Sequence, residues 1–128
     1  MANTPRKFHS KGTRVFHGHA DGTIYECRFV QRAATTGNLI ACATANLPIG
    51  VSPANFVAGD DADYHKQGIC AVETDGSAAI GDTVKAAGDG SGKAIKDISP
   101  GGTPSVFSYG VLLTLDATSN IGDVEAFG

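Results

Sequence analysis

Residues 78–98 read AAIGDTVKAAGDGSGKAIKDI, and this stretch decides the fold class. Its centre, residues 88–92, combines Gly, Asp and Ser, which are typical of tight turns. The flanking segments, residues 83–86 and 93–98, place Val and Ile between polar residues, which favours β-strands. We therefore predict a β-hairpin here.

The same pattern of short apolar segments between turns continues in both directions. In residues 24–30, Tyr25, Cys27 and Phe29 alternate with Glu26 and Arg28, which predicts a strand with one buried face. Other strands are predicted at residues 13–17, 39–43, 49–52, 68–74, 107–115 and 123–127, with residues 53–64 as a loop. The sequence therefore predicts an all-β fold: a compact small sandwich or barrel of about eight short strands with an extended N-terminal arm.

Large side chains are scarce in this chain. It has 128 residues with 17 Gly but only six Phe, three Tyr and no Trp. This length fits one domain, and so few large side chains predict a thin core or stability supplied by partners.

Charge is distributed unevenly along the chain. Residues 1–32 hold six basic and two acidic residues, and the remainder holds four basic and eleven acidic residues. We predict an extended basic arm at residues 1–20 and a single β domain at 21–128, with the arm meeting an acidic partner; the alternative is a solvated, mobile terminus. Basic residues are sparse and no nucleic-acid-binding motif is recognisable, so we predict no direct binding of nucleic acid. The candidate anchoring residues are Arg6, Lys7, Lys11, Arg14, Val15 and Phe16.

Motifs that would indicate catalysis or a bound nucleotide fail on their details. In GDGSGKA, residues 88–94, Ala87 stands where a phosphate loop needs its first Gly, and Ala94 stands where it needs a hydroxyl. The sequence contains no GxSxG, HExxH or CxxC. We therefore predict no enzymatic activity and no cofactor.

Two groups of residues could hold a metal ion. His17 and His19 lie on one face of a predicted strand, and His9 could join them, but no further ligand pattern accompanies the histidines. Residues 60–63, DDAD, lack the spacing of a calcium loop. We predict no metal site, and whether the three histidines bind a metal stays open.

Cys27, Cys42 and Cys70 lie in the apolar stretches YECRF, IACAT and GICAV. This context predicts buried, reduced thiols, and one disulfide with one thiol is the alternative. Residues 1–12 contain no apolar run typical of a signal peptide, and no segment is long enough to cross a membrane, so we expect synthesis in the cytoplasm.

Residues 49–51 and 68–125 resemble the small capsid cement or decoration proteins of tailed bacteriophages. The resemblance rests on IGV, on HKQGICAVETDGSAAIGDTVKAAGDGSGKAI and on YGVLLTLDATSNIGDVEAF. The matching residues are Gly50, Val51, Gly68, Ile80, Gly81, Asp82, Val84, Asp89, Gly90, Gly110, Val111, Gly122, Asp123 and Val124. Residues 1–20 lie outside the resemblance.

The resemblance implies a compact β domain on the outer surface of an icosahedral shell. Its expected partner is the major capsid protein, its expected state on the shell is a homotrimer, and its expected role is to stabilise the shell against the pressure of the DNA. The alternative is a β module on a virion or cell surface that binds a carbohydrate or a receptor. That module would need aromatic platforms, which so few aromatic residues can barely supply. A metal-dependent binding domain that uses the histidines is a further alternative.

Overall fold

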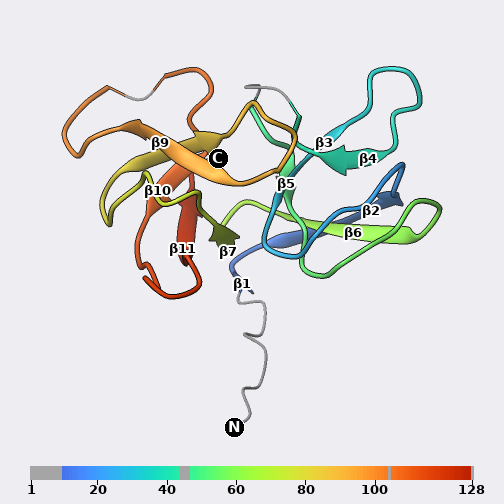
Figure 1. Ribbon diagram of the computed structural model, residues 1–128, viewed down its shortest axis with the longest axis horizontal. Helices are drawn as coiled ribbons and strands as arrows, with labels where there is room; N and C mark the ends of the chain where they lie inside the picture. Colours follow the sequence, from blue (N-terminus) through green and yellow to red (C-terminus); the bar gives the residue numbers. More distant parts are fainter. Residues whose placement is uncertain (1–9, 44–46, 104, 128) are drawn as a thin grey trace, which may run out of the picture.

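The computed structural model describes residues 10–43, 47–103 and 105–127, and these residues form eleven β-strands and no helix. The strands build two antiparallel sheets, which lie side by side in Figure 1 and form a sandwich-like fold. The all-β prediction is confirmed, and no helix in these ranges could span a membrane.

One sheet has five strands, in the order β2-β6-β5-β3-β4. They are β2 (Arg14–His19), β3 (Phe29–Arg32), β4 (Leu39–Ala41), β5 (Gly50–Val51) and β6 (Asp61–Lys66). The other sheet has six strands, in the order β1-β7-β11-β10-β8-β9. They are β1 (Ser10–Lys11), β7 (Ile69–Glu73), β8 (Thr83–Ala86), β9 (Ala94–Ile98), β10 (Gly110–Leu112) and β11 (Ile121–Ala126). The predicted hairpin is therefore β8–β9.

The chain passes between the sheets twice near one point, from β1 to β2 and from β6 to β7. Gly12 and Gly68 lie where these connections meet, and both have a positive φ, +70° and +66°. A Cβ on Gly68 would lie 2.4 Å from the carbonyl oxygen of Lys11. Only glycine allows the two main chains to come this close.

Two apolar clusters form the interior. The larger cluster joins the sheets: Phe29 and Val51 of the five-stranded sheet pack with Cys70, Val72, Leu112 and Val124 of the other. The smaller cluster covers the opposite face of the five-stranded sheet and includes Ile24, Val30, Leu39 and Tyr64. The five-stranded sheet is thus buried on both faces at β3, which explains why Phe29 and Val30 are adjacent and both buried.

The predicted strand at residues 24–30 is wrong over its first half. Cys27 has a φ of 60°, which breaks the strand, and the strand begins only at Phe29. The carbonyl of Tyr25 accepts a hydrogen bond from the hydroxyl of Ser52, and its ring is 56% exposed. Residues 25–28 therefore form an irregular connection, although apolar and charged residues alternate along them as they would in a strand.

The predicted loop at residues 53–64 is wrong at its end, because Asp61–Lys66 forms β6. Ala62 and Tyr64 are buried on one face, and the acidic residues between them pair with histidines across the sheet. The predicted strand at residues 107–115 is also too long. Only Gly110–Leu112 forms β10, because Phe107 lies in a turn where its main-chain N–H donates to the hydroxyl of Ser105.

Candidate functional site

Strand β2 forms a long edge of the five-stranded sheet. Its register with β6 pairs Arg14 with Lys66 and His19 with Asp61. The N–H of Ala20 donates to the carbonyl of Asp60 at 2.9 Å. In an antiparallel ladder, main-chain groups alternate in direction. It follows that Val15, His17 and His19 point their N–H and C=O groups away from β6.

The other edges are shorter or covered. The carbonyl of Leu39, in β4, accepts from the N–H of Asp21 at 2.9 Å, and the carbonyl of Ala94, in β9, accepts from the N–H of Asp75 at 3.0 Å. Strand β1 has two residues. Within residues 10–43, 47–103 and 105–127, β2 is therefore the long edge whose outer side is open from Arg14 to Gly18, since a parallel bridge between Ala20 and Leu39 of β4 covers only its end. Open edges of this kind readily accept a further strand.

Cations gather around two stacked rings, which we call the cationic–aromatic cluster: Arg14, Phe16, Arg32, Tyr64 and Lys66. The rings of Phe16 and Tyr64 stack at 5.5 Å between centroids. Arg14 Cζ lies 5.7 Å and Lys66 Nζ lies 6.0 Å from the Phe16 centroid. Arg32 Cζ lies 5.8 Å from the Tyr64 centroid, and Arg32 also donates to the Tyr64 hydroxyl at 3.2 Å.

No carboxylate in the described ranges pairs with Arg14, Arg32 or Lys66. Cations held over rings and left without an acidic partner favour an acidic group from outside the chain. The cluster is therefore chemically suited to an acidic partner.

Histidines occupy the other face of β2. His17 Nδ1 lies 2.6 Å from Asp63 Oδ1, and His19 Nδ1 lies 3.0 Å from Asp61 Oδ1. Each ring thus has a carboxylate opposite it. Burial lowers the pKa of His65, next along this face, despite the charge of Asp63. No three residues of the described part form a group that could hold a metal.

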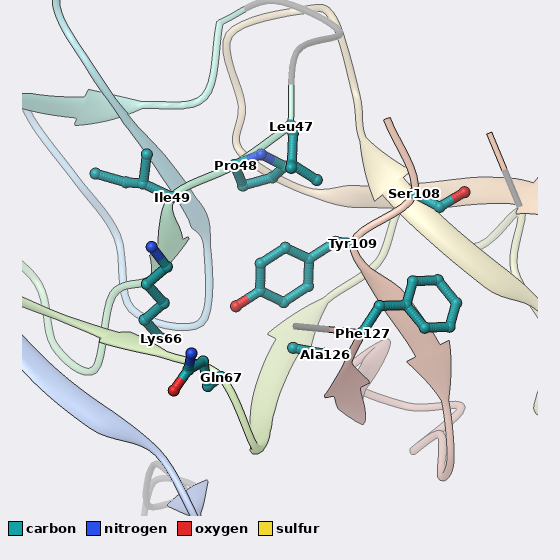
Figure 2. Close-up of a pocket in the computed structure, with 9 residues that line it drawn as sticks. All are labelled: Leu47, Pro48, Ile49, Lys66, Gln67, Ser108, Tyr109, Ala126 and Phe127. Carbon is teal, nitrogen blue, oxygen red and sulfur yellow. The ribbon is translucent and has the colours of Figure 1, made fainter. Parts of the chain in front are cut away.

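A groove of about 460 Å³ opens between the two sheets, as Figure 2 shows. One wall consists of Leu47, Pro48 and Ile49, before β5, and the other carries Ala126 and Phe127, at the end of β11. Leu47 and Phe127 are each 52% exposed, which is high for large apolar side chains. We call this feature the inter-sheet groove.

Tyr109 lies at the floor of the inter-sheet groove. Its residue is 7% exposed, and its ring packs against Phe29 at 4.8 Å between centroids. Its hydroxyl is directed toward the side where Lys66 and Gln67 lie (Figure 2). Burial raises the pKa of Tyr109, and the proximity of Cys70 adds to this effect. The hydroxyl is buried and has no hydrogen-bond partner among the described residues.

The loop that leads to Tyr109 is fixed by Asp97. Asp97 accepts hydrogen bonds from the hydroxyls of Ser105, at 2.8 Å, and of Ser108, and Lys85 Nζ lies 3.4 Å from its carboxylate. Burial alone would raise the pKa of Asp97, but these hydrogen bonds and the Lys85 charge lower it. The Ser108 hydroxyl, at the rim of the groove, is therefore bound to a carboxylate and positions the loop.

The predicted anchoring residues lie in three places. Arg6 and Lys7, like His9, lie outside the described residues. Lys11 is exposed on β1, and Arg14, Val15 and Phe16 lie on β2, so residues 10–20 belong to the two sheets. The structure brings Arg14 and Phe16 together.

Sequence reasoning missed Arg32, Tyr64, Lys66 and the whole inter-sheet groove. The alternation of Ala62 and Tyr64 with charged residues was a strand signal that the acidic run obscured. All three cysteines are buried, as predicted. Burial, with the neighbouring Cys27 and Asp123, raises the pKa of Cys70 to about 12.

No protein-family model matches this chain, and no curated protein sequence does. Among solved structures, the chain is similar to the N base of head fiber gp8.5 in bacteriophage phi29. The match has a TM-score of 0.67 and covers 89% of this chain and 93% of that chain, at 14% identity. The two chains therefore share a fold.

Proposed function

We propose that this protein is a structural protein of a tailed-bacteriophage virion that binds the outer surface of the capsid shell. Its role is to stabilise the shell against the pressure of the packaged DNA. The observation that carries this proposal is the fold shared with the base of a phage head fibre. The partner is the major capsid protein, to which the chain binds as a homotrimer.

The open edge of β2 and the cationic–aromatic cluster support this proposal, because together they suit an acidic, extended partner. An added strand would gain main-chain hydrogen bonds from Val15 and His17, which lie before the bridge of Ala20 with Leu39. Each exposed ion pair with Arg14 or Lys66 would contribute only about 0–1 kcal/mol. Three copies on one shell site would multiply these weak contacts into tight attachment. Arg6 and Lys7, which lie outside the described residues, are further anchoring cations in this proposal.

Co-sedimentation with shells assembled from the major capsid protein of the same phage tests the edge of β2. Val15→Pro deletes a main-chain N–H that points away from β6, so the five-stranded sheet is kept. Val15→Thr changes the side chain and keeps the N–H. We expect Val15→Thr to bind shells like the natural protein and Val15→Pro to bind poorly, with circular dichroism confirming that both are folded.

Salt titration of the same binding tests the cluster. We expect the double variant Arg14→Ser, Lys66→Ser to weaken binding and to flatten its dependence on salt concentration. Lys96→Ser, on β9, is the matched control and should leave the salt dependence unchanged. If the natural protein does not sediment with shells, or if shells with and without it release DNA at the same temperature, the proposed function is wrong.

A further inference from the structure

The open part of the β2 edge is short and has a boundary at each end. At one end, the chain crosses to the six-stranded sheet at Gly12, where φ is +70°. At the other end, the bridge of Ala20 with Leu39 closes the edge. Residues 14–18 lie between these boundaries and have room for about five residues of an added strand, or roughly 17 Å at the rise of a β-strand. The edge therefore offers space for one short extended segment.

Main-chain groups determine where such a segment is held. Because the N–H of Ala20 donates to β6, the alternation of an antiparallel ladder also directs the main-chain groups of Phe16 toward β6. The N–H and C=O groups of Val15 and His17 point the other way, out of the sheet. Each of these two residues therefore offers one donor and one acceptor to an added strand.

The two faces of this edge differ in their chemistry. Successive side chains of a strand alternate, so Arg14 and Phe16 project to one face and Val15 and His17 project to the other. Val15 is apolar and 49% exposed. His17 already has a carboxylate beside it, because Asp63 Oδ1 lies 2.6 Å from its Nδ1. An acidic residue added on this second face would meet the charge of Asp63, whereas an apolar residue would cover Val15.

The face of Arg14 lacks an acidic group. Arg14 and Lys66 are directly opposite each other in the register, and like charges in such positions weaken a ladder. No carboxylate in the described ranges pairs with either residue. Arg14 Cζ lies 5.7 Å from the centroid of Phe16, and a guanidinium over a ring keeps N–H groups in its own plane, directed away from the ring. These groups suit a carboxylate on an added strand.

We propose that the edge of β2 selects one pattern of partner strand, in which an acidic residue adjoins a β-branched apolar residue. The acidic residue lies on the face of Arg14 and accepts hydrogen bonds from its guanidinium. The apolar residue lies on the other face and packs against Val15. Main-chain hydrogen bonds with Val15 and His17 hold the segment in place. The inference rests on the proposed function in one respect, since the shell protein supplies the segment.

Two fluorescent peptides of the same composition test this pattern without any shell. In the alternating peptide, Glu and Val alternate, so one face is acidic and the other is apolar. In the paired peptide, Glu-Glu and Val-Val alternate, so every register places a Glu on the face of Val15 and Asp63. Fluorescence anisotropy measures both affinities. We expect the alternating peptide to bind about fivefold more tightly, which is the upper end of what one exposed ion pair contributes.

Amide hydrogen exchange measured by NMR locates the bound peptide. With the alternating peptide in excess, the outward N–H groups of Val15 and His17 should exchange more slowly by about tenfold or more. The N–H of Phe16, which faces β6, should change little. Val15→Pro deletes an outward donor and should bind the peptide poorly, whereas Val15→Thr keeps the N–H and a β-branched side chain and should bind nearly as well. Circular dichroism confirms that both variants are folded.

Charge reversal tests the preference for an acidic strand. Arg14→Glu should weaken binding of the alternating peptide by about fivefold or more, and it should instead prefer a peptide in which Lys replaces Glu. Lys96→Glu, on β9, is the matched control and should change neither affinity. A merely structural role of Arg14 would not exchange one preference for the other.

The inference is overturned if the natural protein binds neither peptide, because the cations of the edge would then serve to keep other strands away. Equal affinity for the alternating and the paired peptide would overturn it as well. Shell binding separates this failure from failure of the proposed function. A protein that sediments with shells but prefers neither peptide refutes the strand pattern and leaves the function standing. Preference for the alternating peptide without shell binding refutes the function and leaves the strand pattern standing.

Discussion

Replacing Tyr109 with Phe removes one oxygen atom from the interior and keeps the ring that packs on Phe29. For most buried tyrosines this change lowers the free energy of unfolding, because a hydrogen bond is lost. Here the hydroxyl has no partner among the described residues. Folding therefore strips the hydroxyl of water and returns nothing, so we expect Tyr109→Phe to stabilise the free protein.

The size of the effect follows from the cost of the unpaired group. Burying a hydroxyl without a partner costs about 1–3 kcal/mol, and the phenyl ring avoids this cost. Part of the gain is lost because the vacated space is small and unfilled. We expect the free energy of unfolding to rise by about 1 kcal/mol, which for a domain of this size raises Tm by roughly 3–5 °C.

Urea denaturation followed by circular dichroism measures this change, since the chain has no Trp to report by fluorescence. Two other tyrosines calibrate the result. Tyr25→Phe removes a hydroxyl from an exposed ring and should change stability by less than about 0.5 kcal/mol. Tyr64→Phe removes the acceptor for Arg32 and should cost about 0.5–1.5 kcal/mol.

The outcome that contradicts this reasoning is a loss of stability in Tyr109→Phe similar to that in Tyr64→Phe. Such a loss would mean that the Tyr109 hydroxyl is hydrogen-bonded in the free protein.

Three further predictions concern the fold. Gly68→Ala should cost more than Gly76→Ala, by about 1–3 kcal/mol in urea denaturation, because both have a positive φ but only Gly68 lies against another main chain; equal losses would contradict this. Asp97→Asn should destabilise the protein at neutral pH by about 1.5–3 kcal/mol. Because the pKa of Asp97 in the folded protein lies below 3.8, the contribution of its carboxylate to the free energy of unfolding is present above about pH 4. That contribution is lost as the pH falls through the folded pKa. Thermal melts of Asp97→Asn should therefore depend less on pH below about pH 5 than those of the natural protein, and parallel pH profiles would refute this. Cys70, with a pKa raised to about 12, should resist a thiol reagent at about pH 8 until urea unfolds the chain, and rapid labelling of folded protein would refute its burial.

The sequence carried enough local signal to predict most strands. The β8–β9 hairpin was predictable because its Gly, Asp and Ser residues favour a turn and its Val and Ile residues favour the strands on either side. The prediction for residues 24–30 was wrong over its first half because side-chain alternation does not reveal the left-handed backbone at Cys27. The acidic run before Tyr64 hid β6, since the partners of Asp61 and Asp63 are histidines more than 40 positions away, as the pairing of His17 with Asp63 shows (separation 46).

The candidate site was predictable only in part. Arg14 and Phe16 could be selected from the basic N-terminal region, but Lys66 joins them through the register of β2 with β6, which a single sequence does not encode locally. The inter-sheet groove lies between Leu47 and Phe127, which are 80 positions apart in sequence. Such a groove exists only once both sheets are packed.

The five-stranded sheet is synthesised before most of the six-stranded sheet that covers it. Residues 14–66 are complete before β7–β11 have been made. At that stage Ile24, Val30 and Leu39 can already pack together, whereas Phe29 and Val51 face a sheet that does not yet exist. An uncovered apolar face promotes aggregation. Premature termination near residue 68 would therefore release a fragment that aggregates. Rapid synthesis of the second sheet protects the nascent chain from the same aggregation.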